Sequence, residues 1–177
     1  GKTLKVNAAD VIIAGLSALA GLGALLQLPV WAIFIGWAWY IALGNKKRAI
    51  REGGATAIMA AVLALSAIAL TDALQQFMLP LAASMTAVFV AILLLMIFLK
   101  LPAFTSSLVA FNSFSCIFAG YYLRAFPVQE SYLMSLLMAF VWITGANVLG
   151  LLLGHINATL IAWVQGAWKS SPETAPE

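Results

Sequence analysis

Charge is scarce in this chain of 177 residues: nine residues are Lys or Arg, six are Asp or Glu, and together they make up 8% of the sequence. An ordinary soluble domain is about 25% charged, and it needs those residues to cover its core. With 64% of the residues hydrophobic, we exclude an ordinary soluble enzyme, a nucleic-acid-binding module and a disordered protein. The composition predicts an integral membrane protein.

Residues that carry out chemistry are also few. The sequence has one His and one Cys, so paired histidines cannot hold a metal or a haem, and Cys116 cannot form a disulfide within the chain. The sequence contains no glycine-rich phosphate loop and no Ser-His-Asp set. We therefore expect no enzyme activity, no cofactor, no metal site and no catalytic residue.

Long apolar segments follow one another along the chain, and about 20 apolar residues cross a bilayer as a helix. The predicted fold is all-α, a polytopic membrane protein with a single six-helix domain over residues 1–168. The predicted spans are 10–27, 29–44, 53–70, 79–99, 102–123 and 131–153. Residues 158–168 either extend the last helix or lie as a helix on the membrane surface. Residues 169–177 have the composition of a disordered tail.

Several residues mark the limits of these segments. Asn7 and Asp10 form a capping pattern for the first helix, and Pro102 suits the first position of the fifth. Gly44-Asn45 is typical of a helix end, and Gly53-Gly54 of a loose helix start.

The basic residues predict the orientation. If six spans start from an N-terminus on the inside, the cytoplasmic side holds eight basic residues: Lys2, Lys5, Lys46, Lys47, Arg48, Arg51, Lys100 and Lys169. The other side holds only Arg124. This asymmetry is a positive-inside signal, so we expect a multi-pass membrane protein with both termini in the cytoplasm.

Six spans also divide into two halves of three. Because three is odd, the two halves would run with opposite topology, as in many transporters and channels. The second helix of each half begins similarly, with Leu28-Pro29 and with Leu101-Pro102. Parity and these two dipeptides are compatible with an inverted repeat without demonstrating it.

No ionisable side chain lies in the middle of a predicted span, which argues against a proton-coupled pump or a voltage sensor. Polar and aromatic side chains remain, and we interpret eight of them as candidates for a solute path: Phe34, Trp37, Phe104, Thr105, Asn112, Ser115, Thr144 and Asn147. Thr105, Asn112 and Ser115 share one predicted helix face. The alternative is that the polar members join helices, at about 0.6 kcal/mol for each hydrogen bond.

Small residues four positions apart allow helices to pack closely in membranes. Two such pairs, Ser17 with Gly21 and Gly150 with Gly154, predict helix-packing positions.

Two blocks of the sequence resemble a known family. The first is WAIFIGWAWY at 31–40, followed by the glycines at 53–54; the second begins at 102–104 and ends with Phe-Ala-Gly at 118–120. Together they are similar to small bacterial inner-membrane proteins catalogued as domain of unknown function 1097, in which a Gly commonly stands at the position of Ala103. The resemblance implies a multi-span bacterial inner-membrane protein, and it supplies no catalytic residues.

These observations favour a facilitative channel or carrier for a small, mostly neutral solute such as an amide, ammonia or a small alcohol. A narrow path in each subunit of a homo-oligomer suits a chain of this length. The alternative is a non-catalytic structural or accessory subunit of a larger membrane complex. The partners expected are the lipid bilayer and either further copies of the chain or other subunits, and no nucleic acid.

Overall fold

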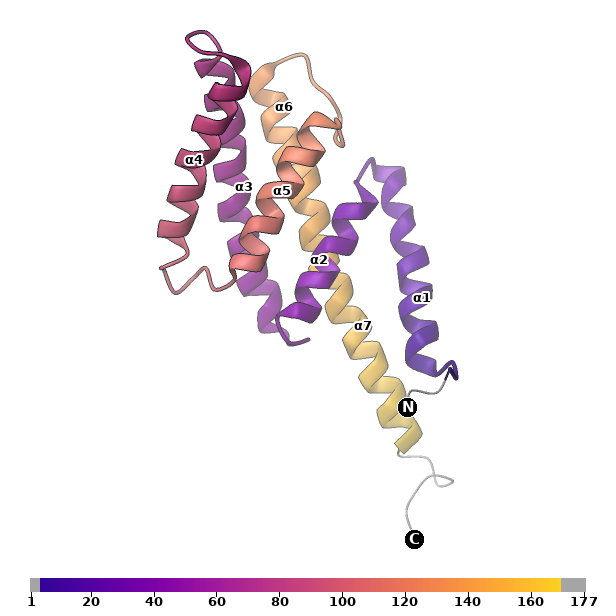
Figure 1. Cartoon of the computed structure of the whole chain (residues 1–177). Helices are drawn as coiled ribbons and strands as arrows, with labels where there is room; N and C mark the ends of the chain where they lie inside the picture. The colour runs from indigo at the N-terminus through magenta and orange to yellow at the C-terminus, as the bar shows by residue number, and fades with distance from the viewer. Residues whose placement is uncertain (1–3, 170–177) are drawn as a thin grey trace.

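The computed structural model describes residues 4–169, and within them the chain is all-helical, with no strand. The helices run alternately up and down, so both ends of the described chain lie at the same end of the molecule (Figure 1). The elements are α1 (Ala8–Ala20), the 3₁₀ helix η1 (Gly21–Leu26), α2 (Val30–Ala42), α3 (Arg48–Leu74), α4 (Pro80–Phe98), α5 (Ser107–Tyr122), α6 (Tyr132–Ala139), the π-helix η2 (Phe140–Thr144) and α7 (Gly145–Lys169).

Four helical runs are long and apolar enough to cross a membrane: Ala8–Leu26, Arg48–Leu74, Pro80–Phe98 and Tyr132–Gly166. Two shorter helices complete the bundle, α2 with 13 residues and α5 with 16. The all-helical, apolar architecture agrees with the fold class expected of a membrane protein.

Two of the predicted helix limits are confirmed. The side chain of Asn7 accepts from the backbone N–H of Asp10, and the Asp10 carboxylate accepts from the N–H of Asn7, both at 3.0 Å. This capping box satisfies two donors that the first turn of α1 would leave free. At the end of α2, Gly44 and Asn45 both have positive φ, 98° and 57°, the backbone conformation that ends a helix.

Two other limits were predicted wrongly. Pro102 does not start α5; the residues after α4 form a turn, and the helix begins at Ser107 with Ser106 as its cap, whose side chain accepts from the N–H of Val109. A serine oxygen satisfies an early helix N–H, which a proline cannot do. Gly53-Gly54 is not a helix start either, because α3 begins at Arg48 and both glycines are buried within it.

The last helix continues well beyond residue 153. α6, η2 and α7 form one helical run, so residues 158–168 extend the helix, which was one of the two alternatives. The 35 residues from Tyr132 to Gly166 correspond to about 50 Å at 1.5 Å per residue, more than the hydrocarbon core requires. The end of α7 accordingly projects past the other helices (Figure 1). The predicted tail lies almost wholly in 170–177, outside the described residues.

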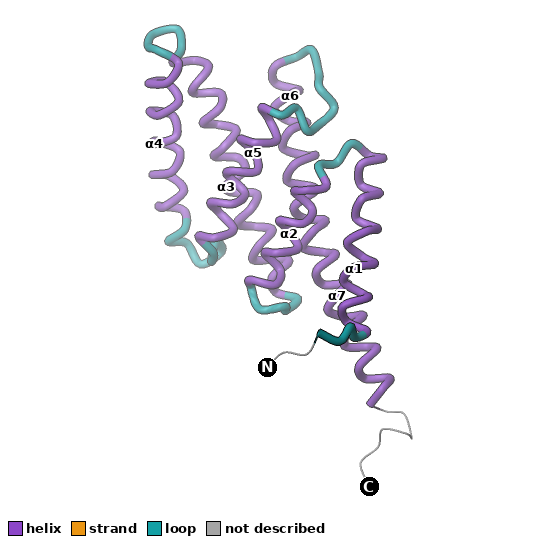
Figure 2. Tube along the Cα trace, turned by 45° about the vertical axis from the view of Figure 1, so that its right-hand side comes forward, coloured by secondary structure: helices purple, strands orange, loops and turns teal. Residues whose placement is uncertain are grey.

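The centre of the bundle is formed by four helices: α2, α3, α5 and α7. α2 packs along α7, while α3 packs against both α4 and α5. α4 lies at one edge and α1 at the other, where α1 meets the rest of the molecule mainly through α7 (Figure 2). Small residues on α3, including Ala60, Ala64 and Ala67, are fully or almost fully buried in the main core. Their small side chains bring the neighbouring helix axes close together.

Of the helix contacts made at glycines, the contact between α2 and α7 is the closest. A Cβ added to Gly36 would lie 1.8 Å from the backbone oxygen of Asn147, and one added to Gly150 would lie 1.9 Å from that of Ile33. One added to Gly154 would lie 2.7 Å from the Cβ of Tyr40. The two backbones therefore touch with no side chain between them.

The other predicted packing pair behaves differently. A Cβ added to Gly21 would meet nothing within 4 Å, and Ser17 is only partly buried. Gly21 therefore makes no close helix contact within the described chain, because the 3₁₀ turn η1 begins at this residue and leaves it exposed.

We expect Gly150→Ala to lower the free energy of unfolding by about 3 kcal/mol, because the new methyl group collides with backbone that cannot move aside. Gly145→Ala is the matched control on the same helix, since its methyl group would meet nothing within 4 Å. The control should stabilise the helix by up to about 1 kcal/mol. Thermal unfolding in detergent micelles measures both, and equal melting temperatures would contradict the close contact.

Candidate functional site

A short segment of α5, residues 112–116, contacts all three other central helices through polar groups. The indole N–H of Trp39 on α2 donates to the side-chain oxygen of Asn112 at 3.3 Å. The hydroxyl of Ser113 donates to the backbone oxygen of Ala57 on α3 at 2.7 Å. One turn further along, the sulfur of Cys116 accepts a contact of 3.8 Å from the side-chain nitrogen of Asn147 on α7. Residues 112–116 of α5 therefore lie where α2, α3 and α7 meet.

Asn147 on α7 completes the arrangement. It is 1% exposed, and its side-chain nitrogen donates to the backbone oxygen of Ala32 at 2.7 Å and to the sulfur of Cys116 at 3.8 Å. We call Trp39, Asn112, Ser113, Cys116 and Asn147 the central polar cluster. Its hydrogen bonds satisfy groups that would otherwise be costly to bury in lipid.

Four buried side-chain oxygens have no partner within the described part of the chain. They are the amide oxygens of Asn147 and Asn157 and the hydroxyls of Thr56 and Thr144. Thr144 ends the π-helix η2, and such wide turns are often found at functional sites. An amide or hydroxyl oxygen that is buried without a partner can accept an N–H or O–H from a small molecule.

The structure brings only some of the predicted path residues together. Asn112 and Asn147 both belong to the central polar cluster, and Trp37 is buried beside Gly150 at the α2–α7 contact. Phe104 lies in the turn before α5, where its ring packs edge-on against Phe98 with centroids 6.4 Å apart. Thr144 lines a shallow cavity between helices instead.

Three of the predicted path residues lie on the outside. Phe34 is 41% exposed on α2, while Thr105 and Ser115 are exposed. The predicted shared face of Thr105, Asn112 and Ser115 is therefore wrong. Thr105 precedes the helix, and the buried face of α5 passes through Ser113, leaving Asn112 at its edge.

Sequence reasoning did not assign Trp39 and Cys116 to this region. Cys116 lies four positions after Asn112, which is the spacing of neighbours on one helix face. That spacing was the available signal for Cys116. The role of Trp39 depends on how α2 and α5 cross, which no local pattern reports.

Two more side-chain contacts link the first two helices to the last one. The hydroxyl of Tyr40 lies 3.0 Å from Nδ1 of His155, and the indole N–H of Trp142 donates to the backbone oxygen of Leu26 at 2.8 Å. Both contacts join residues more than 100 positions apart. They hold α2 and η1 in register along the last helix.

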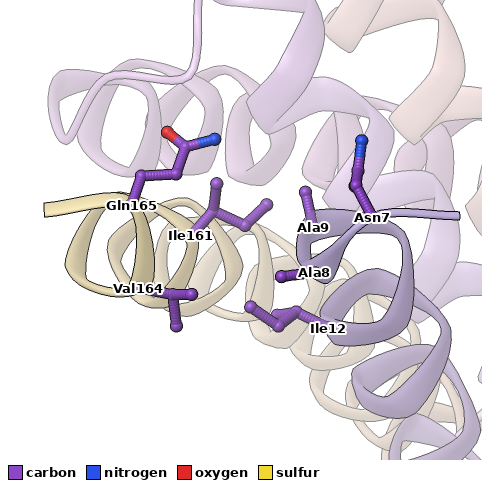
Figure 3. A pocket seen from close by; sticks show the side chains of 7 residues that line it. All are labelled: Asn7, Ala8, Ala9, Ile12, Ile161, Val164 and Gln165. Carbon is purple, nitrogen blue, oxygen red and sulfur yellow. The ribbon is translucent and has the colours of Figure 1, made fainter. Parts of the chain in front are cut away.

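One cavity, of about 600 Å³, lies between the start of α1 and the end of α7. Figure 3 shows that its lining comes from the two helices, with Asn7 and Ile12 on one and Ile161, Val164 and Gln165 on the other. The side chain of Asn7 is already used in the helix cap, and no charged residue lines the cavity. Of five cavities of about 370–600 Å³ among the described residues, none is lined by Asn112 or Asn147.

Metal-ligating groups do not gather within the described residues: no three His, Cys, Asp or Glu side chains come together there. The chemistry of the central polar cluster is that of neutral hydrogen bonding. It can orient a small uncharged molecule through donors and acceptors.

We expect Asn147→Ala to lower the free energy of unfolding by about 1–2 kcal/mol, since it removes the hydrogen bond to Ala32. Asn157→Ala is the control: this buried amide is on the same helix, and its oxygen has no partner among the described residues. Asn157→Ala should therefore lower the free energy of unfolding by less than Asn147→Ala. Thermal unfolding in micelles compares the two, and an equal or larger loss for Asn157→Ala would contradict the role given to Asn147.

Comparison with known proteins identifies the family. Residues 11–167 match the family described as Protein of unknown function (DUF1097), which is the family that the two sequence blocks resemble. Neither the curated proteins nor the solved structures contain a match. Because the match spans most of the sequence, from the first helix to the end of the last, the chain belongs to the DUF1097 family.

Proposed function

We propose that this chain is a six-span protein of the bacterial inner membrane, built from two inverted halves, that lets a small, mostly neutral solute cross at the junction of those halves. It acts without catalysis. In this proposal all six helices cross the bilayer, including the short α2 and α5, and both termini are cytoplasmic.

The packing of the helices supports the inverted halves. If α1–α3 form one half and α4–α7 the other, α2 corresponds to α5 and α3 to the last helix. The contact of α2 with α7 then corresponds to that of α5 with α3, and the contact of α1 with α7 to that of α4 with α3. All four contacts are present, as a pseudo-twofold axis in the membrane plane requires.

The central polar cluster is the observation that carries the proposed path. Its hydrogen bonds run from Trp39 to Asn112, from Asn147 to Ala32 and from Ser113 to Ala57. Each of these bonds joins one half to the other. In proteins made of inverted repeats the solute site lies at the repeat interface near the bilayer midplane, and in this proposal the bonds of the central polar cluster mark that interface.

The unpartnered atoms indicate the solute chemistry. The oxygen of Asn147 and the hydroxyls of Thr56 and Thr144 are buried without partners, and no charged group accompanies them. They favour a solute with N–H or O–H donors and no net charge, such as an amide, ammonia or a small alcohol. A charged solute would lose its hydration on entering, and no charged side chain beside these atoms would compensate for that loss.

The lipid-facing surface supports assembly into a homo-oligomer. α4 packs mainly against α3, and Met85, Phe89 and Leu93 line an apolar groove on its outer side. In this proposal α4 meets another copy of the chain. The alternative function, an accessory subunit of a larger complex, would place a different protein there.

The six-span topology is tested by cysteine labelling in intact cells. With Cys116 replaced by Ala, a single Cys is introduced at Lys100 or at Val128, and a membrane-impermeant maleimide is added from outside. We expect labelling at Val128 and none at Lys100 until the membrane is permeabilised. The reverse pattern, or equal labelling at both, would contradict the positive-inside orientation.

Transport is tested by swelling of proteoliposomes with urea, ammonia and small alcohols. We expect uptake above that of protein-free liposomes for at least one solute, and Asn112→Leu should lower it about tenfold, equivalent to 1.4 kcal/mol in the barrier. Ser115→Leu is the matched control, because Ser115 is exposed on the same helix and its loss should leave uptake unchanged. Uptake equal to protein-free liposomes for every solute would favour the accessory-subunit alternative.

A further inference from the structure

A second polar site lies at the end of the molecule opposite the termini. A cavity of about 450 Å³ opens between the end of α5, the loop that follows it and the start of α6. Its lining includes Tyr121, Tyr122, Arg124, Glu130, Tyr132 and Ser135. Of the five cavities among the described residues, this is the one lined by charged side chains. Its volume falls in the range of small-molecule sites.

Aromatic rings form much of the wall. Tyr121 stacks on Phe126 with centroids 6.0 Å apart and meets Tyr122 edge-on at 5.3 Å. The hydroxyl of Tyr132 donates to the carboxylate of Asp72, at the end of α3. This bond brings the negative charge of Asp72 next to the ring of Tyr132. Electron-rich ring faces beside carboxylates form a favourable site for an organic ammonium group.

The rim of the cavity is held in place by its own hydrogen bonds. The hydroxyl of Ser135 donates to the backbone oxygen of Gln129 at 2.8 Å, and the N–H of Gln129 donates back to that hydroxyl at 3.3 Å. Arg124 directly follows the end of α5 with φ of 55°, and its N–H donates to the backbone oxygen of Tyr121 at 3.1 Å. A wall ordered before a ligand arrives loses less entropy on binding.

The charges around the cavity have both signs. Arg124 is the one basic residue at this end of the described chain, and it lines the cavity together with Glu130. A guanidinium group binds carboxylates with two parallel hydrogen bonds. Tyrosines at a membrane boundary often serve only as interfacial anchors, but that role explains neither the bond from Tyr132 to Asp72 nor the charged pair in the lining.

We propose that this cavity binds a small zwitterion that carries a carboxylate and an ammonium group. Arg124 holds the carboxylate, while the tyrosine rings and Glu130 hold the ammonium group. The site is independent of the proposed transport, because binding to the cavity requires neither a path through the bundle nor a given orientation in the membrane.

The test is isothermal titration of the full-length protein in detergent micelles with three probes of one shape. Glycine betaine has both charges, choline has only the ammonium group, and 3,3-dimethylbutanoate has only the carboxylate, with carbon in place of the nitrogen. We expect glycine betaine to bind at least about tenfold more tightly than choline or 3,3-dimethylbutanoate. Each of those two probes lacks one charged contact, and a tenfold difference in affinity corresponds to about 1.4 kcal/mol. Equal affinities, or no binding of glycine betaine, would overturn the proposal.

Variants assign the two ends of the ligand. Arg124→Gln should reduce the affinity for glycine betaine to that for choline and leave choline binding unchanged, whereas Glu130→Gln should weaken both. Lys100→Gln, an exposed charge at the other end of the bundle, is the control and should change neither. Melting temperatures verify folding; if Arg124→Gln does not purify, Glu130→Gln carries the test. An equal effect of Arg124→Gln and Lys100→Gln would overturn the assignment.

Discussion

The direct contact between the backbones of α2 and α7 is the constraint on which the rest of the structure depends. Gly36 and Gly150 have no side chain to hold the helices apart, so backbone meets backbone at their crossing. Only at this separation can the amide of Asn147 reach the backbone oxygen of Ala32 at 2.7 Å. In lipid, where helices gain little from hiding apolar surface from one another, close packing and hydrogen bonds supply the association energy.

The same physics accounts for the central polar cluster. A polar side chain surrounded by hydrocarbon must find a partner within the protein, and α5 supplies partners to three helices from little more than one turn. Asn112, Ser113 and Cys116 each meet a different neighbour. Not every polar atom of the cluster has a partner among the described residues, since the side-chain oxygen of Asn147 has none. In the proposed function this acceptor receives an N–H or O–H from the solute, while the nitrogen of the same amide holds α7 to α2.

Composition and spacing were sufficient to predict the helical membrane class, the α1 cap and the end of α2, because each depends on residues next to one another in the sequence. Pro102 and Gly53-Gly54 misled for a physical reason: a proline or glycine permits a helix boundary without requiring one. The cap at Ser106 and the packing of Gly53 beside Leu43 and Leu151 decided those positions. The partners of Asn112 and Asn147 could not be predicted, since they come from helices 73 and 115 residues away and depend on how the bundle closes.

The native cysteine offers the most direct measurement of the central claim, that the solute passes where the two halves meet. Cys116 belongs to the central polar cluster, is 3% exposed and is the only cysteine of the chain. A small water-soluble methanethiosulfonate applied to the folded protein in liposomes should modify it slowly, and the transported solute should slow the reaction further. Modification only after unfolding in denaturant, with no reaction in the folded protein, would contradict a path through the junction of the two halves.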